Sequence, residues 1–71
     1  MNITIRSLTG QEIPLNVQND TTILQVKENF AEKTGFQADL IRIVFQGKEL
    51  ENEKNISDYP TLQDGSKIYM I

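Results

Sequence analysis

A two-residue alternation of apolar and polar side chains near the start of the chain constrains its fold more than any other feature. Apolar residues recur in two runs, at Met1, Ile3 and Ile5 and again at Ile13, Leu15 and Val17. This period is typical of β-strands that bury one face. Thr9-Gly10 separates the two runs, and a glycine there can adopt the positive φ that a bulged hairpin loop needs. We therefore expect the chain to begin with a β-hairpin.

Pro14 restricts where the second strand of this hairpin can lie. If Ile13 and Leu15 bond to the first strand, the nitrogen at position 14 points away from it. Proline has no N–H to offer to a further strand on that side. We therefore expect the second strand to lie at an edge of the sheet.

The pattern after residue 21 predicts a helix of about three turns. Thr22 and Gln25 have the spacing of a capping box, in which each side chain bonds to the backbone of the other residue. Three apolar groups and one lysine stem share a helix face, at Ile23, Val26, Lys27 and Phe30. Gly35 lies where a left-handed C-terminal cap belongs. Leu24 falls on the opposite face, either as an ordinary exposed leucine or as a second contact point.

Further short elements follow the helix. Residues 41–45 predict a third strand, Gln46-Gly47 a turn, and residues 48–50 a short return strand. Residues 56–59 are too few for a regular helix and predict one tight turn. Residues 67–71, after a turn at Asp64-Gly65, predict a last strand. Together these elements indicate one α+β domain, residues 1–71, with a single helix against one face of a single sheet.

Composition excludes several kinds of chemistry. The chain contains neither cysteine nor histidine, which removes disulfides, thiolate zinc sites and the histidine base that would activate a serine. One sheet and one helix also leave no desolvated pocket for a carboxylate acid–base pair. We therefore expect neither catalysis nor a cofactor, and we expect Glu49, Glu51 and Glu53 to form a solvated edge rather than a metal site.

The net charge of -3 disfavours nucleic acid as a partner, because lysine and arginine supply most of that affinity. No apolar run approaches the ~20 residues of a membrane-spanning helix, and the first residues lack the pattern of a secretory signal. We expect a cytoplasmic or nuclear protein that is not secreted.

Many residues stand at the spacing found in ubiquitin, without a gap as far as Tyr59. They are Leu8, Thr9, Gly10, Lys27, Arg42, Phe45, Gly47, Lys48, Leu50 and the run Ser57-Asp58-Tyr59. The resemblance is most specific over residues 41–51, which are similar to the third-strand hairpin of the ubiquitin family. After Tyr59, the chain aligns with ubiquitin if one residue is inserted, at Pro60 or Thr61. The resemblance implies the β-grasp fold, a mixed sheet of four to five strands packed on one helix. In that fold the first and last strands are parallel neighbours at the centre, and the third lies beside the last.

The resemblance also implies a surface that binds partner proteins. Strand parity turns Val44, Tyr69 and Ile71 away from the helix, and the resemblance places Leu8 near them. Parity assigns four basic residues to the same face, and we expect them to form a basic rim: Arg6, Arg42, Lys48 and Lys67. The predicted partner-binding residues are accordingly Leu8, Arg42, Val44, Gly47, Lys48, Tyr69 and Ile71.

Ubiquitin is joined to its targets through a tail that ends in Gly-Gly, and this sequence stops at Ile71, before such a tail. We therefore expect a noncovalent, monomeric module that binds receptor-like helices or small domains, in the proteasome pathway or in another large assembly. Two alternatives stay open: a structural subunit locked into a large assembly, and a covalent modifier recorded without its tail. Three lysines stand on acceptor positions of ubiquitin and are candidate modification sites: Lys27, Lys33 and Lys48.

Overall fold

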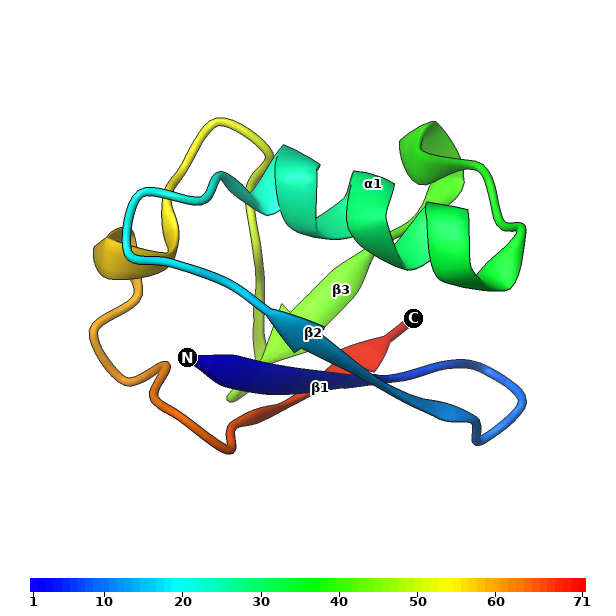
Figure 1. The fold of residues 1–71 in the computed structure, drawn as a ribbon, viewed down its shortest axis with the longest axis horizontal. Coiled ribbons are helices and arrows are strands. Elements are labelled where there is room, and N and C mark those ends of the chain that lie inside the picture. Colours follow the sequence, from blue (N-terminus) through cyan, green and yellow to red (C-terminus); the bar gives the residue numbers. More distant parts are fainter.

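The computed structural model describes all 71 residues and places one helix across a single sheet (Figure 1). β1 (Asn2–Arg6) and β5 (Lys67–Met70) are parallel neighbours in the sheet. β2 (Glu12–Asn16) pairs with the other side of β1, and β3 (Ile43–Phe45) lies between β5 and β4 (Lys48–Glu49). The strand order β2-β1-β5-β3-β4 confirms the predicted α+β fold of the β-grasp type.

The first hairpin forms as the alternation predicts. Ile3 and Ile5 of β1 and Leu15 of β2 are buried, while Gly10 in the connecting turn has a φ of 88°. Pro14 is exposed and β2 is an edge strand. The missing N–H of Pro14 therefore leaves the pairing of β2 with β1 intact.

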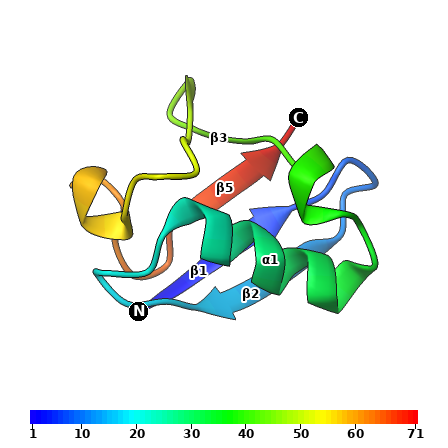
Figure 2. The same cartoon turned by 90° about the horizontal axis from the view of Figure 1, so that it is seen from above.

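α1 (Ile23–Thr34) begins and ends at the predicted caps. The Thr22 hydroxyl accepts a hydrogen bond from the Gln25 N–H at 3.1 Å, and the Gln25 side chain accepts one from the Thr22 N–H at 2.9 Å. Gly35 has a φ of 83° and donates its N–H to the Ala31 carbonyl at 2.7 Å. Viewed from above, α1 lies across the strands (Figure 2). No helix in the structure combines the length and the apolar character that crossing a membrane requires.

One apolar core of 14 buried residues fills the space between α1 and the sheet. Phe30 of α1 is fully buried, and its ring stacks on that of Phe36 with centroids 6.1 Å apart. The predicted tight turn is a short 3₁₀ helix, η2 (Ile56–Asp58), which brings Ile56 and Tyr59 into the core. Since the core uses only the inner side of the sheet, the outer side remains available to solvent.

The third strand is shorter than the alternation predicts. Residues 38–40 form a second 3₁₀ helix, η1 (Ala38–Leu40), and the Ile41 N–H bonds back to the Ala38 carbonyl at 3.2 Å. Ile41 is therefore buried without joining the sheet, and β3 begins only at Ile43. β4 covers two residues, although the Leu50 N–H still bonds to the Ile43 carbonyl at 3.0 Å.

Candidate functional site

The sheet surface opposite α1 is the face that the sequence predicts for binding. α1 covers one side of the sheet only, as Figure 1 shows. Strand register aligns one outward residue from each strand in a continuous row, in the order Glu12, Arg6, Tyr69, Val44 and Glu49. Opposed side chains on neighbouring strands have Cβ atoms about 5 Å apart, so the row crosses the sheet without a break. We use the term open face for this row together with Arg42, Lys67 and Ile71.

The middle of the open face is apolar. Val44 and Tyr69 are opposed across β3 and β5, and Tyr69 is 47% exposed. Ile71, which is 50% exposed, donates its N–H to the Arg42 carbonyl at 2.9 Å and so lies beside the segment that enters β3. The predicted outward placement of Val44 and Tyr69 is thus confirmed, while the binding role of the set stays a prediction.

Leu8 lies in the turn that follows β1 and is 67% exposed. Because β1 and β5 run parallel, this turn and Ile71 lie at the same end of the sheet, as Figure 2 shows for the loop after β1 and the C-terminus. Leu8 therefore extends the apolar centre at that end, in the direction that the family resemblance implies.

Carboxylates neutralise much of the rim that we expected to be basic. The Arg42 guanidinium donates two hydrogen bonds to Glu49, from Nε to Oε2 at 3.0 Å and from Nη2 to Oε1 at 2.8 Å. Lys67 Nζ donates to Glu12 Oε2 at 3.0 Å. The prediction of a basic rim was wrong for Arg42 and Lys67, because it overlooked the two glutamates that share their face. The apolar centre instead lies between two exposed ion pairs.

These ion pairs shift the ionisation of their members. The hydrogen bond and the charge of Lys67 lower the pKa of the Glu12 carboxyl below its usual value. A hydrogen bond from Arg42 likewise lowers the pKa of Glu49, and the same bond raises the pKa of Arg42. Both carboxylates are consequently charged and paired near neutral pH, although such exposed pairs contribute little to stability.

Lys48 does not belong to the row on the open face. The two-residue turn Gln46-Gly47 pairs Phe45 with Lys48 and Val44 with Glu49. Opposed residues point to the same side of a sheet, so the turn reverses the parity of the return strand. The predicted outward placement of Lys48 was therefore wrong. With Phe45 and Tyr59, Lys48 instead lines a hollow of about 300 Å³ beside the sheet edge.

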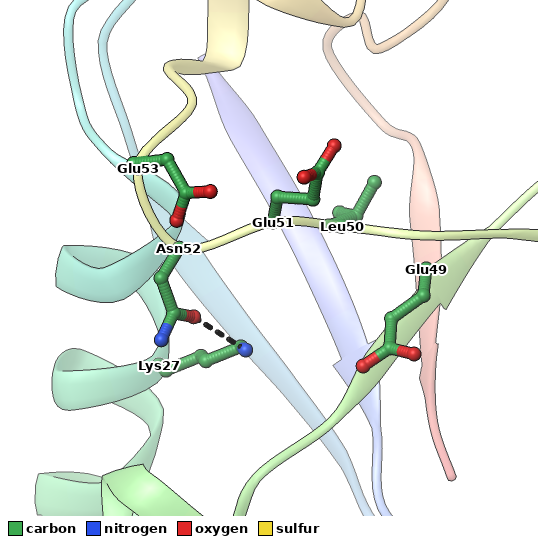
Figure 3. Close-up of a pocket in the computed structure, with 6 residues that line it drawn as sticks. All are labelled: Lys27, Glu49, Leu50, Glu51, Asn52 and Glu53. Atoms are coloured by element: carbon green, nitrogen blue, oxygen red, sulfur yellow. Dashed lines mark hydrogen bonds between the residues drawn. The ribbon is translucent and has the colours of Figure 1, made fainter.

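Lys27 lines a second hollow, of about 320 Å³, between α1 and the segment after β4 (Figure 3). Lys27 is only 5% exposed, and its Nζ donates to Asn52 Oδ1 at 2.6 Å. Glu49, Glu51 and Glu53 also line this hollow, but no three acidic groups lie close enough together to hold a metal ion.

The three candidate acceptor lysines differ in their access to other proteins. The Lys27 side chain is buried as part of the packing of α1, whereas Lys33 and Lys48 are exposed. An acceptor amine has to reach a reacting partner. Lys33 and Lys48 therefore meet the steric requirement of the prediction, and Lys27 does not in this fold.

Comparisons with known proteins agree with this geometry. A family model described as "Ubiquitin family" matches residues 3–71. Ubiquitin-like protein 1 of Schizosaccharomyces pombe is 31% identical over 71 residues, which cover 100% of this chain and 90% of that protein. Ubiquitin-like protein NEDD8 of Dictyostelium discoideum is also 31% identical over 71 residues, covering 91% of its own length.

A different kind of relative is the E3 ubiquitin-protein ligase parkin of Mus musculus. It is 38% identical over 58 residues, which are 82% of this chain but only 12% of the ligase. A domain of this type thus occurs both as nearly a whole protein and as a small part of a longer one. Together with the strand order and the match over residues 3–71, these relatives identify the chain as a member of the ubiquitin family.

Proposed function

We propose that this chain is a noncovalent protein-interaction module, and that its open face binds partner proteins. The observation that carries the proposal is the outward pair Val44 and Tyr69, with Ile71 beside it and an ion pair on either side. Exposed apolar side chains that are contiguous and have a polar rim mark interaction surfaces more often than isolated ones do. We assign the chain no catalytic role, since its serines have no histidine to activate them.

The size of the open face indicates weak binding. A surface of this kind buries an area near the low end of specific interfaces, with about 1 to 2 kcal/mol from each of a few anchors. A dissociation constant of about 10 to 500 μM follows, which suits a transient adaptor. Such a module gains strength when it is tethered or repeated.

The partners we propose are amphipathic helices or small domains of the type that ubiquitin receptors use. An amphipathic helix can lay its apolar stripe across Val44 and Tyr69 and keep its polar flanks over the ion pairs. The match to a segment of parkin supports a domain that operates within a longer protein. We place this activity in the cytoplasm or nucleus.

Covalent modification is the second candidate function. It is favoured by similarity along the whole chain to ubiquitin-like proteins, among them one named NEDD8. The intact mass and C-terminal sequence of the protein from its native source separate the candidates. A free chain that ends in Gly-Gly would favour the modifier, whereas a heavier chain with additional domains would favour the interaction module.

Backbone amide shifts test the proposed binding face. We would titrate the labelled protein with a helical peptide from a ubiquitin receptor and expect shifts on residues 6–8, 42–44 and 67–71. Shifts concentrated on α1 around Leu24 and Glu28 would instead show that the binding face was wrongly assigned. The Leu24→Ala variant serves as a control and should give the same shifts as wild type, because Leu24 is 39% exposed on the opposite side of the molecule.

A further inference from the structure

The cations around the open face are not equivalent. Arg42 and Lys67 each have a carboxylate partner within 3.0 Å. Arg6 is exposed and lies in the same row, yet no carboxylate approaches it closely enough to form an ion pair. Its neighbour in the row, Glu12, is bonded to Lys67 instead. Arg6 is therefore the one guanidinium or ammonium group of the open face that makes no hydrogen bond to another side chain.

Arg6 also lies at the border of the apolar centre. In the strand register it is directly opposed to Tyr69. Its Nη2 lies 3.9 Å from the position that a Cβ would occupy at Gly10, so the guanidinium extends toward the turn that carries Leu8. A partner that covers Tyr69 and reaches toward Leu8 would pass over this guanidinium. Its approach would exclude water from the group and strengthen any hydrogen bond made there.

We propose that Arg6 is a specificity-determining residue that recognises a single carboxylate on the partner, next to the partner's apolar anchor. This inference rests on the proposed function. The occupant is an amphipathic helix with one Asp or Glu at the flank of its apolar stripe. A guanidinium presents a planar fork of donors that matches a carboxylate and keeps its charge at every physiological pH.

Charge complementarity argues for one carboxylate rather than several. A second acid over Arg42 or Lys67 would meet a cation whose charge Glu49 or Glu12 already offsets, so it would gain less than an acid over Arg6. A helix with acidic residues along both flanks is therefore a poorer match than one with a single acid near Arg6.

Synthetic helices test the inference. The probes are amphipathic peptides with the same apolar stripe, one set with a single Glu on either flank and a matched set with Gln at the same positions. Glu and Gln have similar helix propensity, so the pairs differ mainly in charge. We expect the better Glu peptide to bind the wild-type chain about fivefold tighter than its Gln counterpart, as one partly covered ion pair allows.

Two variants assign this preference to Arg6. In Arg6→Gln the preference should disappear, whereas in Lys33→Gln, which removes the same charge from an exposed position at the end of α1, it should stay. Arg6→Glu should reverse it, so that the Gln peptide binds tighter than its Glu counterpart. Since Arg6 is exposed and makes no side-chain hydrogen bond within the chain, these variants should keep the wild-type amide spectrum elsewhere.

The outcomes separate this inference from the proposed function. One outcome is that the peptides shift residues 42–44 and 69–71, but wild type shows no Glu preference or shares the same preference with Arg6→Gln. The role of Arg6 is then overturned, and the binding face stands. If no peptide shifts those residues, the proposed function is overturned and the role of Arg6 with it. A preference lost in Arg6→Gln, kept in Lys33→Gln and reversed in Arg6→Glu supports the assignment.

Discussion

The two tyrosines of this chain should differ in how much stability they lose on the same chemical change. Tyr59 is 8% exposed, and its hydroxyl accepts a hydrogen bond from the Glu51 N–H at 2.8 Å. Tyr59→Phe removes that acceptor and leaves a partly buried N–H without a partner, which costs about 1 to 2 kcal/mol. Tyr69 is 47% exposed on the open face and makes no side-chain hydrogen bond, so Tyr69→Phe should change stability by less than about 0.5 kcal/mol.

Urea unfolding of the two variants beside wild type measures the difference. Tyr59→Phe should lower the urea concentration at the unfolding midpoint. The dependence of the free energy of unfolding on urea concentration should stay unchanged, because the same surface is exposed on unfolding. In a thermal scan, a loss of 1 kcal/mol corresponds to a Tm lower by about 4 to 8 °C in a domain of this size. Equal losses in both variants, or a larger loss in Tyr69→Phe, would refute the burial and hydrogen bonding assigned to Tyr59.

Three further predictions concern the helix cap and the ion pairs. Thr22→Ala should lower the free energy of unfolding by about 1 kcal/mol in urea, because the Gln25 N–H loses its acceptor. An equal loss in exposed Thr61→Ala would contradict this. The lowered pKa values of Glu12 and Glu49 stabilise the fold above the pKa of the unfolded chain, and this contribution is lost as pH falls through the folded pKa. Urea midpoints measured below about pH 5 should therefore fall more steeply in wild type than in the Glu12→Gln, Glu49→Gln double variant, and parallel curves would argue against it. Lys67→Gln removes the partner of Glu12, so the Glu12 carboxylate should pair with Arg6. The preference of the chain for Glu over Gln peptides should then weaken. An undiminished preference would show that the Glu12 carboxylate does not reach Arg6.

Local signals in the sequence predicted the elements that local interactions determine. The alternation around Ile3 and Leu15 indicated two strands, and the spacing of Thr22 and Gln25 indicated where the helix begins. Each of these signals depends on neighbours within four residues along the chain or on burial of one face. The structure confirms them with small changes in length. The exception is Ile41, whose N–H is bonded to the Ala38 carbonyl in a 3₁₀ turn. Asp39 is a turn-favouring residue in that segment, but the alternation of Ile41 and Ile43 favoured a strand.

The charged rim could not be predicted in the same way. Lys67 and Glu12 are 55 residues apart in sequence, and the pairing of β1 with both β2 and β5 brings them together. The position of Glu49 was available from the two-residue turn, because that turn length sets Glu49 opposite Val44. The sequence prediction continued the alternation of β3 through the turn, and it therefore placed Lys48 on the open face where the structure has Glu49. Pairing register, rather than composition, determines the charge of the open face.

The dissociation constant of a ubiquitin-receptor helix for Tyr69→Ala, measured beside Leu24→Ala, tests the role of the open face most directly. Both residues are large, partly exposed and apolar over most of their surface, but they lie on opposite sides of the molecule. We predict that Tyr69→Ala weakens binding by about 1 to 2 kcal/mol, which is roughly 5- to 30-fold, and that Leu24→Ala leaves it unchanged. Binding that survives in Tyr69→Ala and is lost in Leu24→Ala would contradict the assignment.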